Sequence, residues 1–334
     1  MPERKVLTQI SPVAWEHPAD RAALNTLRGI PGFDDLVRKV LSFFGERGIR
    51  HLFLANAVKI GPRQRPKLNA MYTEVLETLD WPERPELYVT QTPDVNAGAV
   101  GFEKPFIILN TGTLGLLERE EQRTVLGHEL GHVMSGHATY RTIALILLTV
   151  GVRNLPFLAG MALLPIELAL FEWFRKSELS CDRAGLLSGQ DPQAAMRTEL
   201  KLAGGGVRMS GLATGEEDEI NLEEFLIQAE EYEAGGNAID NVFKVLNVAF
   251  RTHPFNTVRA AELQRWVKSG DYDRILAGDY PRRDASGDRP LSDDYIDAVG
   301  YYGQQARAAV DQVADVLRGA RDAFTDAFRT QQKK

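Results

Sequence analysis

The sequence of 334 residues contains a single cysteine, Cys181, which excludes an internal disulfide and is compatible with a reducing compartment. Residues 1–7 have no apolar core of signal-peptide length, so we do not expect export by the general secretory route. The net charge of −7 argues against a nucleic-acid-binding protein. The hydrophobic content of 44% indicates an ordinary globular protein with a sizeable core.

An apolar run long enough to cross a membrane is also missing. Residues 143–174 are the most apolar part of the chain, but Arg153 and Asn154 interrupt them, and prolines stand at positions 156 and 165. We therefore predict a helical hairpin. It is either buried in the protein or in contact with a membrane face, and both alternatives stay open. We expect a cytoplasmic protein with peripheral contact to the inner face of the cell membrane at most.

The motif that organises the chain is His-Glu-x-x-His at positions 128–132. Residues four apart lie on one face of a helix, so His128 and His132 can share one Zn²⁺. Glu129 lies next to the first ligand and is placed to act as the general base that takes a proton from the attacking water. Acidic residues at positions 118–121 suit the start of this helix. The sequence therefore predicts one zinc ion per chain.

A catalytic zinc needs a third protein ligand. His137 is the nearest candidate in sequence, but a continuing helix places it on the opposite face. Glu178 fits better, because an antiparallel hairpin that turns near residues 155–156 returns Glu178 to the level of His132. Asp182 shares the face of Glu178 and can accept the free ring N–H of a ligating histidine. We therefore predict Glu178 as a ligand and Asp182 as its supporting carboxylate.

The fold class that these segments predict is α+β, predominantly helical, with a small sheet before the zinc helix and a long C-terminal helix. Strands are expected at residues 87–90 and 106–110, where apolar and β-branched residues are frequent. The predicted organisation is an N-terminal helical region at 1–66, a metallopeptidase core at 67–270 that includes the apolar hairpin 141–176, a linker at 278–290 and a C-terminal helix at 291–334.

The combined pattern resembles the gluzincin family of the CAAX prenyl proteases and the bacterial heat-shock membrane proteases. The likeness rests on His-Glu-x-x-His and on Glu-x-x-x-Asp at positions 178–182, and it covers roughly residues 70–265. It extends to Asn96, Ala97, the strand at 106–110 and Gly112 upstream, and to His253, Pro254 and Arg259 downstream. The resemblance implies that residues 96–101, with Asn96, Ala97 and Gly98 as substrate-binding residues, form the edge strand beside which an extended peptide lies.

His253 stands before Pro254, which disfavours a helical conformation at His253 and suits the start of the helix that holds Arg259. Two alternatives stay open. His253 is either a structural residue at the start of that helix or a catalytic residue that stabilises the oxyanion of the transition state. In the second case Arg259 braces the loop or a nearby carboxylate.

The leading hypothesis is a zinc-dependent endopeptidase that acts on a protein or peptide substrate. One rival is an inactive, zinc-stabilised scaffold that binds a partner protein. Glu129 favours the enzyme, because a structural zinc site needs no base and usually has four protein ligands. A second rival is a zinc hydrolase that acts on a non-peptide amide.

Overall fold

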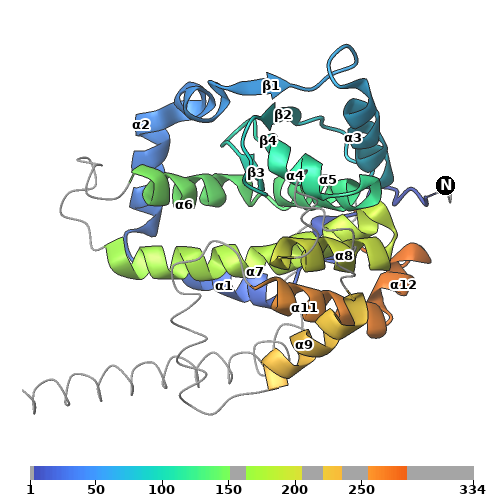
Figure 1. Cartoon of the computed structure of the whole chain (residues 1–334). Helices are drawn as coiled ribbons and strands as arrows, with labels where there is room; N and C mark the ends of the chain where they lie inside the picture. The colour runs from blue at the N-terminus through green and yellow to red at the C-terminus, as the bar shows by residue number, and fades with distance from the viewer. Residues whose placement is uncertain (1–3, 151–162, 205–220, 235–254, 284–334) are drawn as a thin grey trace, which may run out of the picture.

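The computed structural model describes residues 4–150, 163–204, 221–234 and 255–283 (Figure 1). Helices dominate these residues, and they surround a four-stranded sheet. This arrangement confirms the predicted α+β, predominantly helical class. The predicted C-terminal helix at 291–334 and the predicted catalytic residue His253 lie outside the described residues.

The described part of the chain contains four strands and a larger number of helices. The strands are β1 (Ala57–Lys59), β2 (Glu86–Thr90), β3 (Ala97–Val100) and β4 (Phe106–Asn110). The helices of the first half are the 3-10 helix η1 (Pro12–Ala14), α1 (Pro18–Arg28), α2 (Phe33–Leu54), α3 (Pro66–Thr78), α4 (Thr111–Leu116), α5 (Arg119–Met134) and α6 (Ala138–Val150). Those of the second half are α7 (Leu163–Gly189), α8 (Pro192–Ala203), α9 (Leu222–Ala234), α11 (Asn256–Lys268) and α12 (Asp271–Leu276).

The sheet has the strand order β1-β2-β4-β3 and precedes α5 in the chain, as predicted, with only the short helix α4 between β4 and α5. β2 pairs with β4 in parallel, whereas β1 and β3 run antiparallel to their neighbours. Among the residues that the structure describes, β3 is therefore an edge strand, with β4 on one side and no strand on the other.

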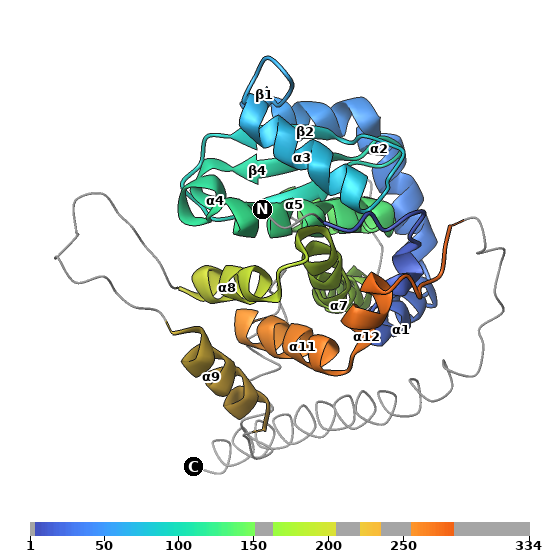
Figure 2. The ribbon, with the colours of Figure 1, turned by 90° about the vertical axis from the view of Figure 1, so that its right-hand side faces the viewer.

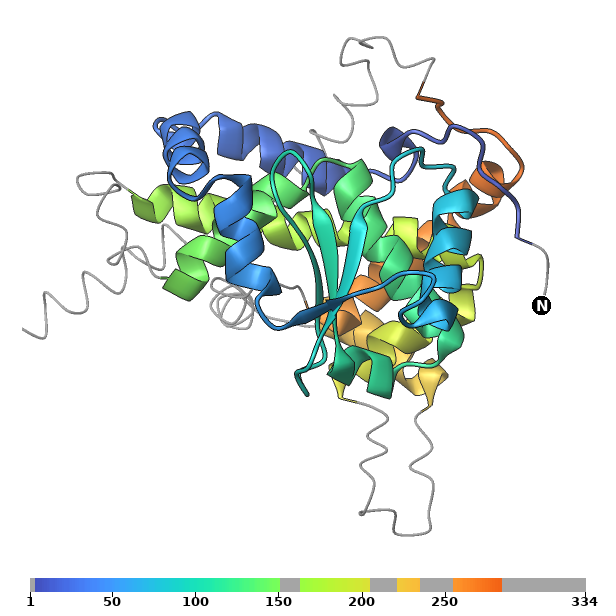
Figure 3. The same cartoon turned by 90° about the horizontal axis from the view of Figure 1, so that it is seen from above.

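The two faces of the sheet pack into two separate apolar clusters, because successive side chains of a strand point to opposite faces. Leu87, Val89 and Ile107 pack with α3 and α5 in one cluster. Phe106 and Ile108 pack with α2, α6 and α7 in the other. Figure 3 shows α2 and α3 on opposite sides of the strands. The sheet thus separates the two halves of the core and holds α5 against one of its faces.

The N-terminal region at 1–66 differs from the helical prediction in two places. Residues 57–59 form β1, whose Val58 pairs with Val89 of β2. Residues 4–17 contain only the short helix η1, and the buried side chains of Leu7, Ile10 and Trp15 join the same cluster as α3. A three-residue strand carries too little periodicity to be recognised before its partner is known.

The helix that carries the motif was predicted to continue into the hairpin at 141–176, but it does not. α5 ends at Met134, and α6 begins a new helix at Ala138. The predicted turn at 155–156 lies outside the described residues. In the described parts of the hairpin, the buried side chains of Ile143, Ile146 and Leu170 belong to the α2 side of the core. Of the helices described, none combines the length and the apolar character needed to cross a membrane.

The first part of the predicted linker at 278–290 is attached to the body of the protein. Ser11 N–H donates to the Pro281 carbonyl at 3.0 Å, and Arg283 N–H donates to the Gln9 carbonyl at 2.9 Å. The Arg283 side chain also donates to the Ile10 carbonyl at 2.9 Å. Residues 281–283 are thus fixed against the N-terminal segment, which their Gly- and Pro-rich surroundings did not predict.

The helices of the second half stack on the side of α5 that faces away from the sheet. α7 packs against α5 along much of its length, and α8 and α11 lie against each other and against α7. Figure 2 shows α8 and α11 on this side, with α9 beyond them. The face of α5 that carries the motif therefore packs directly against α7 in the middle of the protein.

Candidate metal centre

Helix α5 begins where the acidic residues predicted its start. Glu118 is its N-cap, and the Glu118 and Glu121 side chains form a reciprocal capping box with the backbone. His128 and His132 lie one turn apart on the buried face of this helix, with 3.1 Å between their Nε2 atoms. The motif therefore directs both imidazoles toward the same point.

Glycines on α5 allow α7 to approach it closely. A Cβ atom on Gly127 would lie 1.8 Å from Ser188 Oγ, and one on Gly131 would lie 2.6 Å from the Cβ of Ala184. A side chain at either position would force the helices apart. The room that the two glycines leave is thus filled by α7, whose Glu178 and Asp182 face the two histidines.

Glu178 completes a three-ligand cluster with the histidines. Its Oε2 lies 3.4 Å from His128 Nε2, and its Oε1 lies 3.3 Å from His132 Nε2. Ligand atoms that are each 2.0–2.1 Å from a tetrahedral zinc lie about 3.3 Å from one another. The three observed separations match this spacing, and all three residues are buried. The donor set and its geometry therefore fit a zinc ion, as the hairpin argument predicted for Glu178.

The electrostatics of the cluster differ between the two histidines. Burial lowers the pKa of His128, but hydrogen bonds to Asp182 and Glu178 outweigh burial and raise that pKa to about 10. Burial and the positive charge of Arg141 hold the pKa of His132 well below its usual range. His132 is thus kept neutral, which is the form that binds a metal, and the carboxylates around His128 attract a cation.

Asp182 contacts the Nδ1 side of the His128 ring, where it was predicted to lie, and Arg259 in turn contacts Asp182. His128 Nδ1 lies 2.9 Å from Asp182 Oδ1. Arg259 Nε donates to Asp182 Oδ2 at 2.9 Å, and its Nη2 lies 3.2 Å from Glu199 Oε1 on α8. Arg259 therefore lies where it can brace the Asp182 carboxylate. Glu199 was not predicted, since no motif connects it to the cluster.

Arg141 is a second buried cation at the site, and it was only weakly indicated by the sequence. Its guanidinium donates to Glu178 Oε1 and lies 4.1 Å from the centroid of the Phe174 ring. The signal was a single cation directly before the most apolar run of the chain. Arg141 fixes the orientation of the Glu178 carboxylate and offsets part of the negative charge of the cluster.

Glu129 is almost fully buried, and its side chain is 3% exposed. Its Oε2 atom is buried and has no hydrogen-bond partner in the described part of the protein. A buried carboxylate oxygen without a partner is costly and calls for an explanation, such as a water or substrate group that fills the site in action. The position of Glu129 next to His128 fits a general base whose free oxygen can accept a hydrogen bond from a water.

The other predicted site residues lie as follows. Asn96 precedes the edge strand β3, which contains Ala97 and Gly98 and lies against α5. His137 lies beside His132, with 3.2 Å between their Nδ1 atoms, and not on the opposite face of a continuing helix.

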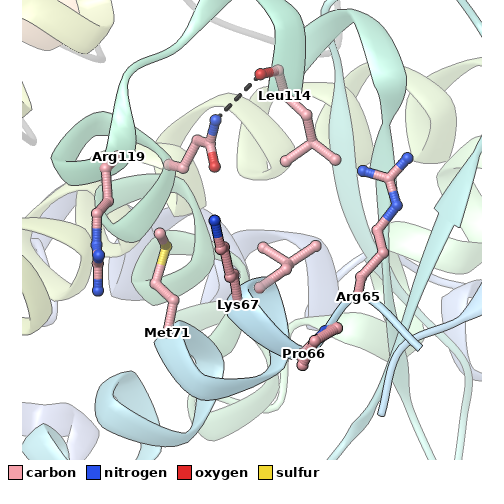
Figure 4. Close-up of a pocket in the computed structure, with 8 residues that line it drawn as sticks. Arg65, Pro66, Lys67, Met71, Leu114 and Arg119 are labelled. Carbon is pink, nitrogen blue, oxygen red and sulfur yellow. Dashed lines mark hydrogen bonds between the residues drawn. The ribbon is translucent and has the colours of Figure 1, made fainter. Parts of the chain in front are cut away.

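A separate hollow of about 550 Å³ lies near the N-terminal ends of α3 and α5 (Figure 4). It is lined by Arg65, Pro66, Lys67, Leu68, Met71, Leu114, Arg119 and Gln122. Gln122 Nε2 closes one side by donating to the Leu114 carbonyl at 3.0 Å. None of these residues belongs to the His128, His132 and Glu178 cluster, so the hollow contributes no ligand to the metal centre.

Comparison with known proteins agrees with this geometry. Residues 62–267 match the family model described as peptidase family M48, which is more than half of the chain. No solved structure matches the chain at a significant level.

Three relatives illustrate the range of the likeness. The plastoglobule-localized metallopeptidase 48, chloroplastic, of Arabidopsis thaliana is 33% identical over 265 residues, which cover 78% of this chain and 74% of that protein. A protease HtpX homolog of Moorella thermoacetica is 34% identical over 125 residues, covering 36% of this chain and 40% of its own length. Another, of Lactobacillus helveticus, is 40% identical over 80 residues, covering 23% and 26%.

Proposed function

This chain belongs to peptidase family M48, and from that premise we propose that it is a zinc-dependent endopeptidase with His128, His132 and Glu178 as its metal ligands. Family membership makes the chain a metal-dependent protease, with peptides or proteins as its substrates. It also favours an enzyme over the inactive scaffold and over a hydrolase of non-peptide amides. The observation that carries the assignment of the ligands is the 3.1–3.4 Å spacing of their donor atoms.

The donor set supports zinc over the harder divalent ions. Two imidazoles and one carboxylate, with a further position open, form the ligand set of a catalytic zinc, whereas magnesium and calcium prefer oxygen ligands. When bound there, zinc supplies a Lewis acid that polarises the peptide carbonyl and makes a water nucleophilic at neutral pH.

Glu129 is the proposed general base. Its buried, unpartnered Oε2 supports this role, because a carboxylate in such a place gains a hydrogen bond when a water enters the site. Glu129 takes a proton from the attacking water and delivers it to the leaving amine as the peptide bond breaks. His132 and His128 keep their orientation during this step because both rings are buried and hydrogen-bonded.

The edge strand β3 is the proposed binding place of the substrate backbone. An extended peptide that adds to a free sheet edge is held by main-chain hydrogen bonds, which suits an endopeptidase that cuts within a chain. Asn96, Ala97 and Gly98 are the proposed contact residues. Their support is the position of β3 at the edge of the sheet and against α5, the helix that carries the motif.

His253 is proposed to stabilise the oxyanion of the transition state. The residue lies outside the described part of the chain, so the proposal rests on the sequence around Pro254 and on the position of Arg259. Loss of one oxyanion donor typically costs about a hundredfold in turnover, or roughly 3 kcal/mol. His253→Ala should therefore keep zinc and fold but lose turnover by about that factor, with a smaller change in KM. Early unfolding with normal turnover would indicate the structural alternative.

The division into a core at 67–270 and flanking regions also stays a proposal. The extent of the family match supports the core, while the packing of Leu7 and Trp15 indicates that the N-terminal region completes it. Cytoplasmic location is proposed, and contact of residues 143–174 with the inner face of the membrane remains the alternative. Extraction of the cell membrane fraction with alkaline carbonate would distinguish peripheral from integral association.

The test of the central proposal combines metal analysis with a peptide-library cleavage assay on wild type, Glu129→Gln and Glu178→Ala. We expect about one zinc per chain in the wild type and in Glu129→Gln, with hydrolysis nearly abolished in the variant. Glu178→Ala should lose most of its zinc, and circular dichroism should confirm that it is folded. Hydrolysis at the wild-type rate by Glu129→Gln, or full zinc content in Glu178→Ala, would overturn the assignment.

A further inference from the structure

A chain of buried polar contacts extends from His132 away from the cluster. His132 Nδ1 lies 3.2 Å from His137 Nδ1, and His137 Nε2 lies 3.3 Å from Asp20 Oδ2. Ser180 Oγ donates to the same Asp20 oxygen at 2.6 Å and accepts from His17 N–H at 2.9 Å. The chain connects α1, α5 and α7, and its side chains are all buried.

The end of α5 brings His137 to this place. Gly136 has a φ of 71°, and its N–H donates to the Val133 carbonyl at 3.1 Å. His137 N–H then donates to the His132 carbonyl at 2.9 Å. These two bonds form a Schellman motif, with Gly136 in the left-handed position that glycine adopts without strain. The chain thus folds back after the helix, and the His137 ring lies beside the His132 ring.

Only one arrangement of protons satisfies this chain when His132 binds a metal. Its Nε2 faces His128 and Glu178, so that nitrogen is the ligand atom and carries no proton. The proton is therefore on His132 Nδ1, which donates to His137 Nδ1. His137 then carries its own proton on Nε2, the nitrogen that lies 3.3 Å from Asp20 Oδ2. The proton on His132 thus meets an acceptor, and the proton on His137 faces a carboxylate.

The other groups around His137 do not compete for this role. Cys181 Sγ lies 3.6 Å from His137 Nδ1, and burial raises the pKa of its thiol well above the usual range. Cys181 is therefore a neutral thiol and not a competing anion. Trp173 contacts the His137 ring edge to face, with 5.5 Å between the centroids. Asp20 is the negative charge that contacts the ring.

We propose that His137 and Asp20 are positioning residues that fix the tautomer and orientation of His132 for metal binding. The inference rests on the proposed metal site. It gives each histidine ligand a support that ends in a buried carboxylate, Asp182 for His128 and Asp20 for His132. Such hydrogen-bond partners raise the basicity of the ligating histidine and hold its ring in the orientation for binding before the metal arrives.

The experiment measures the zinc dissociation constant of the full chain by competition with a chromophoric chelator. His137→Leu removes the acceptor, and we expect it to weaken zinc binding by about 10- to 100-fold. His137→Asn offers an amide oxygen near the position of Nδ1, and we expect it to restore most of the affinity. Thr198→Ala on α8 is the matched control, because it removes a buried hydroxyl that donates to the Ala194 carbonyl and not to a member of this chain, and its zinc affinity should equal that of the wild type.

A structural role alone would give a different result. His137→Leu would then lower the Tm of the metal-free protein, while its zinc affinity would stay at the wild-type value and His137→Asn would rescue nothing. That outcome overturns the inference and leaves the proposed function intact, because wild type would still bind zinc. A wild type that binds no zinc would instead overturn the proposed metal site, and the inference with it.

The tautomers of the wild-type protein supply a second measurement, which decides the matter even where His137→Leu does not fold. Long-range correlations between imidazole protons and ¹⁵N in the zinc-loaded chain should show His137 protonated on Nε2 and His132 protonated on Nδ1. The sequence has six histidines, so these signals are few enough to assign. A proton on His137 Nδ1 would overturn the inference.

Discussion

Arg259 donates to both carboxylate oxygens of Asp182, the residue that holds the His128 ring. The guanidinium also lies 3.2 Å from Glu199 and is almost fully buried. One cation on α11 thus contacts two acidic side chains, one on α7 and one on α8. The orientation of a proposed metal ligand therefore depends on a helix that starts more than a hundred residues after the motif.

Arg259→Leu should destabilise the protein strongly. The change leaves the Asp182 carboxylate buried without its ion-pair partner, and the loss of one member of a buried ion pair costs about 3–5 kcal/mol. Urea unfolding at neutral pH measures the effect. Arg265→Leu on the same helix is the control, since Arg265 is 52% exposed and pairs with Glu262 at the surface, so its change should cost about 1 kcal/mol or less. Equal losses in the two variants would contradict this account of Arg259.

Glu199 should make the stability depend on pH in a defined direction. Burial raises the pKa of Glu199 to about 8, although Arg259 opposes the rise. An unfolded chain releases this proton at a pH of about 4.3, so the folded state holds it between the two values. The stabilising contribution is therefore complete at low pH and is lost as the pH rises toward 8.

Glu199→Gln removes this titration, because the amide resembles the protonated acid at every pH. Wild type should lose stability relative to the variant as the pH rises from 5 to 8. Urea unfolding of both proteins at several pH values in this range gives the difference. A difference that stays constant, or that changes in the opposite direction, would show that Glu199 is ionised in the folded protein.

The ligand cluster could be predicted from the sequence because its residues are close together in the chain or are related by a simple hairpin. His128 and His132 follow the period of a helix, and Glu178 followed from equal hairpin arms. The equal-arm argument led to a residue that does lie beside both histidines, although α5 ends at Met134 and a new helix follows. The close contact of α5 and α7 through Gly127 and Gly131 compensates for that break.

The residues that contact the proposed ligands from outside the cluster were harder to predict. His137 was placed on the opposite helix face because the helix was assumed to continue, whereas Gly136 ends it with a Schellman motif. The glycine was visible in the sequence, so this error was avoidable. Asp20 and Glu199 come from distant segments, and no short-range pattern predicts which distant carboxylate meets a given histidine.

Gly131→Ala tests whether the approach of α5 to α7 matters for the site. Helix propensity alone would stabilise the variant by up to about 1 kcal/mol. The new Cβ would lie 2.6 Å from the Cβ of Ala184, however, and neither atom can move without its backbone. We expect a net loss of about 1–3 kcal/mol and weaker zinc binding.

Gly115→Ala in α4 is the control for that change, since no atom lies within 4 Å of its added Cβ. It should be neutral or slightly stabilising and should leave zinc affinity unchanged. Thermal unfolding and chelator competition give both quantities. A stabilised Gly131→Ala with normal zinc affinity would show that α5 and α7 adjust without cost.

The edge strand β3 has backbone groups on the side that faces away from β4. Asn110 N–H donates to the Asn96 carbonyl at 3.0 Å, and Gly98 pairs with Ile108 in the same register. Hydrogen-bonded pairs alternate along an antiparallel ladder, so the N–H and C=O of Ala97 and Ala99 point away from β4. The Ala97 N–H is covered only by the side chain of its neighbour, Asn96 Oδ1, at 2.9 Å.

Ala97→Pro therefore removes one outward donor without breaking the ladder to β4, since proline is tolerated in an edge strand on its free side. If a peptide adds to this edge, the variant loses one main-chain hydrogen bond of about 1–1.5 kcal/mol, and KM should rise by about tenfold. Zinc content and urea unfolding should stay near the wild-type values, because no ligand and no ladder bond changes. Ala97→Val keeps the N–H and should cleave the same peptides with a nearly unchanged KM. Steady-state kinetics on one peptide from the library separates the two variants, and an unchanged KM in Ala97→Pro would show that the substrate backbone lies elsewhere.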